Sequence, residues 1–240
     1  MAGMEPPFSF GRQGAIAARS PSRASGSTLV SSPALRQDVG VRDSALGARI
    51  VPANKASWDD LEAILAGASC HGGRCYCQRF KLHGTAWPGD ALDPAQMLRE
   101  QTDCGHPKSA TTTGLVAYLD GEPAGWCNVE PRTAYPYLRS VPWRKRKEDR
   151  SDASIWAVPC FITRSGFRRR GLSYALARAA VDFARERGAR ALEGYPMIPE
   201  RGKDVSWGEL NVGHVSIFTA AGFAEVSRPT LRRAVMRIDF

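Results

Sequence analysis

The chain has 240 residues and a mass of 26.1 kDa, with 43% hydrophobic and 24% charged residues. This is the composition of a globular protein that can bury a sizeable core. It contains no apolar run long enough to span a bilayer or to serve as a secretory signal near the N-terminus. The net charge of +9 predicts an anionic partner, which the charge alone leaves open among nucleic acid, an acidic membrane surface and a phosphorylated small molecule.

The periodicity of apolar residues and the turn residues predict a series of helices and strands. In chain order we first expect a strand at 48–51, a helix capped by Ser57 with Asp60 in the capping-box position, and a helix from Asp93-Pro94 to about Asp103. Strands at 113–119 and 123–129, joined by the turn Asp120-Gly121, and a strand at 154–163 should follow. The rest of the chain should form a helix at 171–187 closed by Gly188, a strand at 190–196, a helix at 213–221, and strands near 223–226 and 232–238. Because Pro159 cannot donate to a sheet, the sheet should be bulged, split or at an edge there. The order predicts a mixed α/β sheet.

The N-terminal residues differ in composition from the rest. Residues 1–46 are rich in Ser, Gly, Pro and Arg and lack a sustained period, which predicts a disordered tail before a folded domain at 47–240. The stretch from Pro6 to Gln37 has no acid and also weakly resembles an organelle transit peptide. Six cysteines in a chain of this length do not suggest a secreted disulfide framework, so we expect a cytoplasmic protein with Cys127 and Cys160 as small buried residues.

The junction between the strand at 154–163 and the helix at 171–187 is the most informative feature. Its loop carries Arg168-Arg169-Arg170, followed by Gly171 and the first helical residues Leu172-Ser173. A helix N-terminus attracts anions through its unsatisfied N–H groups and its dipole. Glycine permits close approach to the backbone, and the arginines add positive charge. The junction therefore predicts a diphosphate site.

The same residues resemble a family signature. Arg168-x-x-Gly171-x-Ser173 is similar to Gln/Arg-x-x-Gly-x-Gly/Ala of the GCN5-related N-acetyltransferases (GNAT), with serine replacing the last small residue. The element order and the pair Gly222-Phe223 extend the resemblance over roughly Ala48 to Phe240, and toward an uncharacterised small-molecule subgroup. It implies the GNAT fold, a mixed and mostly antiparallel central sheet that is splayed at the cofactor site and flanked by helices.

The resemblance also implies an activity and a set of binding residues. Acetyl-CoA would be the acyl donor, with its pyrophosphate at Arg168, Arg169, Arg170, Gly171, Leu172 and Ser173, and its pantetheine arm bonded by main-chain groups of Phe161, Ile162 and Thr163. The acceptor would be a primary amine of a small molecule that attacks the thioester directly. A protein amine as acceptor, a non-catalytic CoA sensor and a nucleic-acid-binding module stay open as alternatives, as does a homodimer.

The groups that would move protons depart from the family pattern. Many family members place a tyrosine four residues before the Gly-Phe pair to protonate the leaving thiolate, and this position is Phe218 here. Strand alternation puts Glu193 and Tyr195 on one face, which makes them our candidate catalytic pair. A structural ion pair for Glu193 and packing for Tyr195 fit the pattern equally well. Glu130 is the second candidate base, and His214 is expected to cap a helix.

Two irregular segments carry further polar residues. Residues 66–87 hold the cluster Cys70–His83, whose spacing matches no standard zinc site, so we expect no metal and a loop in which Cys77 and Phe80 line the acceptor pocket. Residues 130–152 contain the run Trp143–Lys147. We interpret this run as a solvated surface loop, with contact to nucleic acid through Arg144–Lys147 as the alternative.

Overall fold

A computed structural model describes part of the chain. The described residues are 41–43, 46–68, 76–82, 93–138, 141–144, 146–199, 202, 205 and 207–240. They belong to one compact unit, Val39–Phe240. The predicted tail lies outside them except for 41–43 and 46, and the Cys70–His83 cluster lies outside them except for 76–82.

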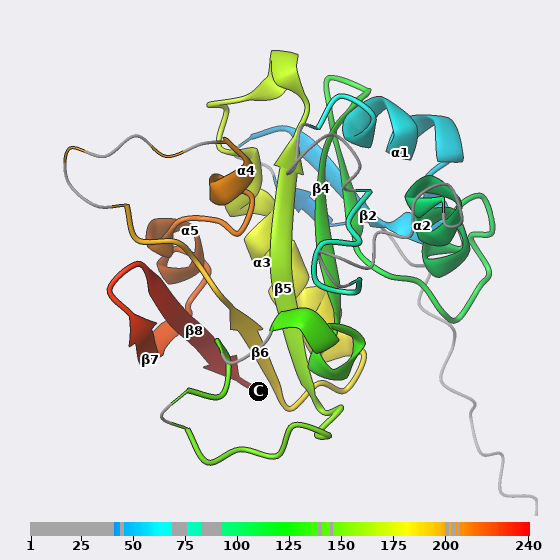
Figure 1. Ribbon diagram of the computed structural model, residues 1–240. Helices are drawn as coiled ribbons and strands as arrows, with labels where there is room; N and C mark the ends of the chain where they lie inside the picture. The colour runs from blue at the N-terminus through cyan, green and yellow to red at the C-terminus, as the bar shows by residue number, and fades with distance from the viewer. Residues whose placement is uncertain are drawn as a thin grey trace, which may run out of the picture. The chain divides into compact units, whose positions relative to one another are not determined.

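The described strands form one sheet in the order β1-β2-β3-β4-β5-β6-β8-β7 (Figure 1). Their bounds are β1 Val41–Asp43, β2 Ala48–Pro52, β3 Leu115–Leu119, β4 Glu122–Pro131, β5 Ile155–Thr163, β6 Ala191–Gly194, β7 Ala224–Thr230 and β8 Arg233–Asp239. The pair β5–β6 is parallel and the other neighbours are antiparallel. The mixed, mostly antiparallel sheet predicted from the sequence is confirmed.

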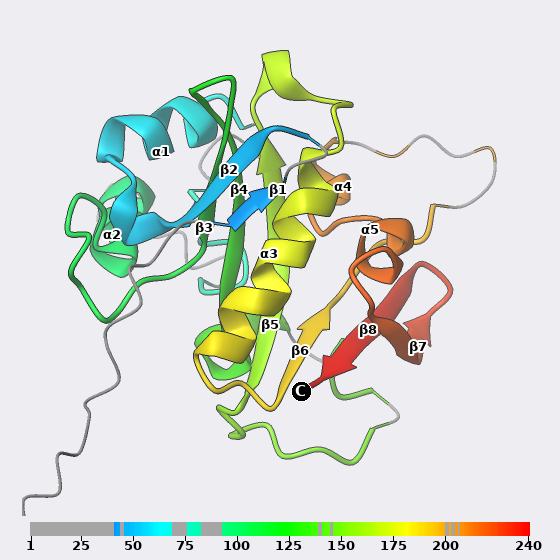
Figure 2. The ribbon, with the colours of Figure 1, turned by 180° about the vertical axis from the view of Figure 1, so that it is seen from behind.

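Helices cover both faces of this sheet. They are α1 Trp58–Leu65, α2 Pro94–Thr102, α3 Leu172–Glu186, α4 Trp207–Leu210 and α5 Val215–Thr219. The apolar residues of α1 and α2 pack in one cluster with Trp126 and Ile162, whereas those of α3 pack in another with Val158, Leu192 and Phe218. Figure 2 shows α3 crossing the back of the sheet, and Figure 1 shows α1 and α2 to one side of it.

Local signals in the sequence account for several element ends. Ser57 and Asp60 form the predicted capping box of α1, with hydrogen bonds of 3.1 and 3.3 Å. Asp120 and Gly121 have φ of 54° and 84°, as a two-residue hairpin turn requires. Asp93 caps α2 through its side chain, and Gly188 follows α3 at φ 76°. These ends depend on neighbouring residues alone, which is why the sequence predicts them.

The sheet opens between β5 and β6. Their pairing ends at Val158↔Gly194, although β5 continues to Thr163. Beyond Gly194 the chain turns to β8 instead, where Ala234 N–H donates to the Pro196 carbonyl and Ile198 N–H to the Arg232 carbonyl. The β4–β5 register shifts between Asn128 and Glu130, opposite Pro159, so the predicted bulge is present. Together, the bulge and the opening give the predicted splay.

Some elements differ from the sequence-based expectation. β6 ends at Gly194 instead of 196, because Pro196 leaves β5 and accepts from β8. The short elements β1 and α4 were not predicted, since three and four residues carry too little periodicity to be recognised. Cys127 and Cys160 are free and buried as expected. Among the described residues, no helix has the length and apolar character needed to cross a membrane.

Candidate functional site

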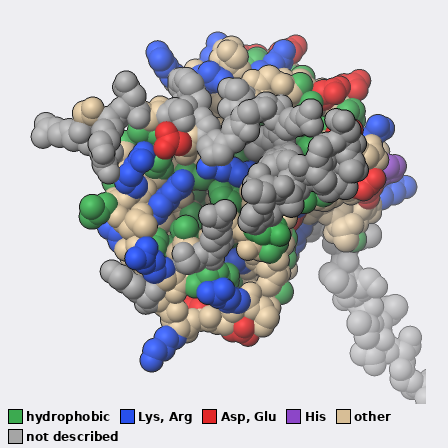
Figure 3. Space-filling view, in the orientation of Figure 1, with side chains coloured by type: hydrophobic (Ala, Val, Ile, Leu, Met, Phe, Trp, Pro, Cys, Tyr) green, Lys and Arg blue, Asp and Glu red, His purple; other side chains and the backbone are tan. Residues whose placement is uncertain are grey.

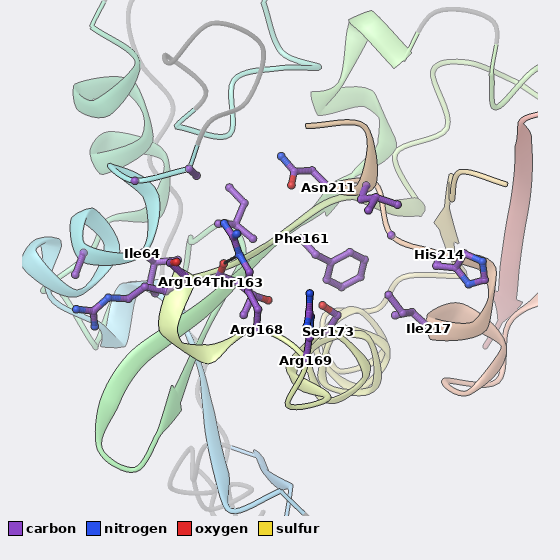
Figure 4. A pocket seen from close by; sticks show the side chains of 17 residues that line it. Ile64, Phe161, Thr163, Arg164, Arg168, Arg169, Ser173, Asn211, His214 and Ile217 are labelled. Atoms are coloured by element: carbon purple, nitrogen blue, oxygen red, sulfur yellow. Dashed lines mark hydrogen bonds between the residues drawn. The ribbon is translucent and has the colours of Figure 1, made fainter. Parts of the chain in front are cut away.

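A pocket of about 480 Å³ lies at the opening of the sheet (Figure 4). Its apolar wall comes from α1, β5 and α5, with Ile64, Phe161, Ile162 and Ile217. Its polar end comes from the loop after β5 and the first turn of α3; this end is lined by Arg164, Ser165, Arg168, Arg169 and Ser173. A pocket with one basic end and a long apolar wall suits an anionic ligand that carries a less polar arm.

The backbone at the polar end is arranged to bind an anion. Arg169 and Gly171 have φ of 63° and 81°, in the left-handed region. This conformation costs a non-glycine residue about 1–2 kcal/mol, and such cost is typical of functional loops. No side chain caps α3 at Gly171, and a Cβ there would meet no atom within 4 Å. The first turn of α3 is therefore open to an oxyanion ligand.

The six residues predicted for a pyrophosphate have different environments. Arg168, Arg169 and Ser173 line the pocket, and Gly171 forms the start of the helix beside them. Arg170 points its guanidinium to Asp120, with a 3.3 Å ion pair on the surface, and Leu172 is buried in the core under α3. The side chains at the pocket are thus three of the six, while Leu172 can act only through its backbone N–H.

The backbone of β5 along the opening alternates in direction. Arg164 N–H donates to Ala124 of β4, so the main-chain groups of Ile162 also face β4, and those of Phe161 and Thr163 face the opening. The Thr163 carbonyl accepts a 3.5 Å contact from Arg168 Nε. Phe161 N–H donates to the Asn211 carbonyl at 2.6 Å. Phe161 and Thr163 therefore offer main-chain groups to a ligand, and Ile162 offers its side chain.

Glu193 lies in a buried ion network beside the pocket, not on its wall. Its carboxylate is fully buried and accepts from Arg146 at 2.7 Å, Arg132 at 3.1 Å and Arg237 at 3.3 Å. The buried Tyr195 hydroxyl donates to it at 2.9 Å. The sequence left open whether Glu193 is a base or a structural ion-pair partner, and these four contacts match the structural alternative. Its role as base stays a prediction, which Glu193→Gln tests.

The loop after β4 closes this network. Trp143 packs on Arg132, whose guanidinium carbon lies 4.0 Å from the ring centroid. Arg146 and Arg132 both bond Glu148. The interpretation of Trp143–Lys147 as a solvated loop is therefore wrong for Trp143 and Arg146, because both point inward and seal buried charge.

Glu148 gives this network a defined pH dependence. Its partial burial raises its pKa, but the hydrogen bond from Arg132 and the charges of Arg146 and Arg237 outweigh that effect and lower the pKa. A lowered folded-state pKa contributes stability above the unfolded value of about 4.3, and the contribution disappears as the pH falls through the folded value.

We therefore expect Glu148→Gln to be less stable than wild type in urea unfolding at pH 7, with a deficit that shrinks toward pH 3. The physical reason is that acid protonates the wild-type carboxyl and makes it resemble the amide. A deficit that stays constant between pH 7 and pH 3 would contradict the assigned role of the Glu148 charge.

Glu130, the second candidate base, has a different environment. It lies at the end of β4 with its side chain 12% exposed, and Lys81 Nζ bonds it at 2.7 Å. Burial raises its pKa, and Lys81 lowers it by a smaller amount. The buried Tyr135 lies beside it and has a hydroxyl with no partner among the described residues. Among the described residues, Glu130 thus has one cationic partner where Glu193 has three.

Phe218 and His214 occupy the positions expected from the sequence. Phe218 is fully buried, and its ring packs edge-on against Phe161 and Phe223, with ring centroids 5.7 and 5.3 Å apart. Because a phenyl ring carries no proton to transfer, this position supplies no acid. His214 caps α5 by accepting from Ser216 N–H and also lines the pocket.

Part of the pocket lining was missed by sequence reasoning. It comprises Ala63, Ile64, Gly67 and Ala68 at the end of α1 and Leu210, Asn211, Gly213 and Ile217 before and in α5. The α1 residues read as an ordinary apolar helix face. Asn211 and Gly213 act through their backbones, since their carbonyls accept from Phe161 and Met197, and backbone contacts leave no sequence signal.

Comparison with protein families gives the same result as the geometry. Residues 79–195 match the model of the Acetyltransferase (GNAT) family, a span that includes the β5–α3 junction. This part of the chain belongs to the GNAT acetyltransferase family. The matched span contains the opening between β5 and β6 and the polar end of the pocket, so it covers the part of this GNAT protein where the donor site was expected.

Solved structures with a similar course of the chain are also acetyltransferases. A GNAT-family acetyltransferase from Streptococcus pneumoniae is 16% identical, with a TM-score of 0.45, 80% of this chain covered and 98% of that chain. An N-acetyltransferase from Staphylococcus aureus Mu50 is 12% identical (TM-score 0.47, 80% and 98%), and a GCN5-related N-acetyltransferase from Kribbella flavida is 19% identical (TM-score 0.45, 82% and 100%). A search of curated proteins found no match to the sequence.

Proposed function

We propose that this GNAT protein transfers the acetyl group of acetyl-CoA to a primary amine of a small molecule. The observation that carries the proposal is the pocket that runs from the arginine-rich first turn of α3 into the opening between β5 and β6. Acetyl-CoA would supply an activated acetyl thioester. The protein's own residues then have to bind the donor, orient the amine and take up its proton.

The donor half of the proposal rests on the match between the pocket and the ligand. A diphosphate needs cationic side chains and free N–H groups, and Arg168, Arg169 and the uncapped start of α3 offer both. A pantetheine arm needs an apolar channel with main-chain partners, and Phe161 and Thr163 face the opening beside Ile217. In the structure the Asn211 carbonyl already accepts from Phe161 N–H, so an arm that uses this donor must displace it.

The proton has to leave the attacking amine. From the sequence, Glu193 with Tyr195 is the first candidate for the base and Glu130 is the second. We favour Glu130, since burial raises the pKa of its carboxyl and so makes it a stronger base, and since Lys81 is its one cationic partner among the described residues. Glu193 is less available to a substrate, because three guanidinium groups and the Tyr195 hydroxyl already bond its buried carboxylate.

We expect acetyl-CoA to raise the melting temperature of the purified protein, and Arg168→Ala to weaken its binding. The charge-assisted bonds of one arginine to a phosphate contribute about 1.5–3 kcal/mol, so the Kd should rise about 10- to 150-fold. Titration calorimetry with acetyl-CoA measures the Kd, and ATP serves as the ligand control.

Arg185→Ala is the matched control variant for this measurement. Arg185 lies in the last turn of the same helix, with its side chain 53% exposed, and it takes no part in the pocket. Equal acetyl-CoA affinities for wild type, Arg185→Ala and Arg168→Ala would exclude the proposed donor site. Absence of any acetyl-CoA binding by wild type would exclude the proposed activity.

A further inference from the structure

Three arginines gather at the edge of the opening, on the side of the sheet away from α3. Arg233 begins β8, and its Nη1 donates to the Tyr195 carbonyl at 3.2 Å. Arg232 precedes it, and the Arg232 carbonyl accepts from Ile198 N–H. Arg79 lies next to Phe80, which packs in the cluster of Tyr135, Tyr195 and Val235. The charges of Arg79 and Arg232 both act on Arg233, so segments distant in sequence place these guanidinium groups near one another.

The positive charge of Arg232 and Arg233 is poorly balanced within the described part of the chain. Glu209 bonds Arg232 Nη2 at 3.3 Å and is the acid that acts on Arg233. Burial lowers the pKa of Arg233, and the charges of Arg79 and Arg232 lower it further. Such a shift means that the environment disfavours the cation, so a nearby anion would stabilise it.

The hydrogen-bond donors of Arg232 and Arg233 also exceed their acceptors among the described residues. A guanidinium has five N–H donors, and the described residues give Arg233 one acceptor, the Tyr195 carbonyl. Arg232 Nε is buried without a partner among the described residues. Figure 3 shows Lys and Arg side chains interspersed with apolar ones on the side where β6, α4 and β8 lie in Figure 1.

The group adjoins the donor pocket. The segment that follows Tyr195 borders the opening, where Met197 N–H donates to the carbonyl of Gly213, a residue that lines the pocket. An acceptor amine has to approach the opening from the side of the sheet that carries Tyr195, because α3 covers the other side. Paired guanidinium groups bind carboxylates and phosphates through parallel hydrogen bonds, and they repel cations.

We infer that the acceptor is a primary amine that also bears a carboxylate or a phosphate, and that Arg233, with Arg79 and Arg232, holds this anionic group. The inference rests on the proposed function and specifies its acceptor. It selects anionic amines, such as amino-acid derivatives, over polycationic amines. Arg233 binds the substrate and sets specificity, and it takes no part in proton transfer.

The test uses the full chain, acetyl-CoA and pairs of amines that differ in one anionic group. 4-Aminobutyrate with 4-aminobutyramide probes a carboxylate, and O-phosphoethanolamine with ethanolamine probes a phosphate. We expect turnover of the anionic member of at least one pair. Arg233→Gln should raise the KM for that member about 10-fold or more with a kcat within about threefold of wild type, because it removes ground-state binding.

Arg228→Gln is the matched control, since Arg228 is an exposed arginine on β7 that pairs with Glu225. Equal kcat/KM for both members of each pair would overturn the inference, as would the same loss for both in Arg233→Gln. So would absence of turnover of any anionic amine by protein that binds acetyl-CoA in calorimetry. Failure to bind acetyl-CoA at all would overturn the proposed function itself. Thermal unfolding of each variant shows whether a loss reflects misfolding.

Discussion

Replacing Gly171 with glutamine is expected to raise the Kd for acetyl-CoA by about 100-fold or more while the domain still folds. Gly171 stands at the uncapped N-terminus of α3, beside Arg168, Arg169 and Ser173 at the polar end of the pocket. A glutamine side chain would extend into the space that a diphosphate needs, and its amide would compete for the first-turn N–H groups. Titration calorimetry with acetyl-CoA measures the effect.

The φ of 81° at Gly171 adds a cost to any side chain, so loss of binding has to be separated from loss of stability. A left-handed conformation costs about 1–2 kcal/mol for a non-glycine residue. Gly188→Gln is a matched control, because Gly188 ends the same helix at φ 76° and a Cβ there also meets no atom within 4 Å. Both variants should lose similar stability, and only Gly171→Gln should lose the ligand.

Either of two results would count against the diphosphate site. One is unchanged acetyl-CoA affinity in Gly171→Gln, which would show that α3 does not bind the donor. The other is an equal loss of affinity in both variants, which would assign the effect to backbone strain in α3. Because both glycines are replaced by the same side chain, the two variants separate a role of Gly171 in binding from a role in backbone conformation.

The fold was predictable wherever structure depends on local chemistry. The capping box of Ser57, the turn at Asp120-Gly121 and the apolar stripe of α3 each specify an element within a few residues. The splay was expected from the family resemblance and from Pro159, which cannot pair. β1 and α4 could not be predicted from the sequence, because elements of three and four residues are stabilised by tertiary contacts and have too little periodicity of their own.

The site was predictable only in its donor half. The Arg168–Ser173 signature is contiguous, so its chemistry is visible in one stretch of sequence. Two other parts of the site are not visible in one stretch of sequence. The pocket wall from α1 is an ordinary apolar surface, and the Asn211 and Gly213 carbonyls are backbone groups placed by tertiary structure. The main-chain groups of Phe161 and Thr163 face the opening, whereas those of Ile162 face β4. The prediction of three consecutive residues does not include this difference.

The environment of Glu193 shows the same limit. Alternation placed Glu193 and Tyr195 on one face, and their 2.9 Å hydrogen bond agrees with it. Strand alternation cannot show which side chains from other segments of the chain contact Glu193. Arg132 and Arg146 come from the loop after β4 and Arg237 from β8, so the ion network depends on contacts 44 to 61 residues apart in the chain.

Glu193→Gln is expected to destabilise the domain by about 3–5 kcal/mol, because it removes the anion that compensates buried guanidinium groups. Arg132 is fully buried and Arg146 and Arg237 are about nine-tenths buried, so water cannot replace the lost charge. Urea unfolding at pH 7 measures the free energy of unfolding. Glu225→Gln is the control, since Glu225 pairs with Arg228 at the surface and its loss should change stability little.

The same variant decides between the two roles of Glu193. If the residue is structural, the protein that remains folded at low temperature keeps its kcat within a few fold, and Glu130→Gln lowers kcat instead. If Glu193 is the base, the protein that remains folded loses kcat, and Tyr195→Phe changes the pH profile of kcat. A buried anion held by three arginines cannot lose its charge at no cost to the fold, so stability falls in either case. The kcat of the protein that is shown to be folded therefore decides between the two roles.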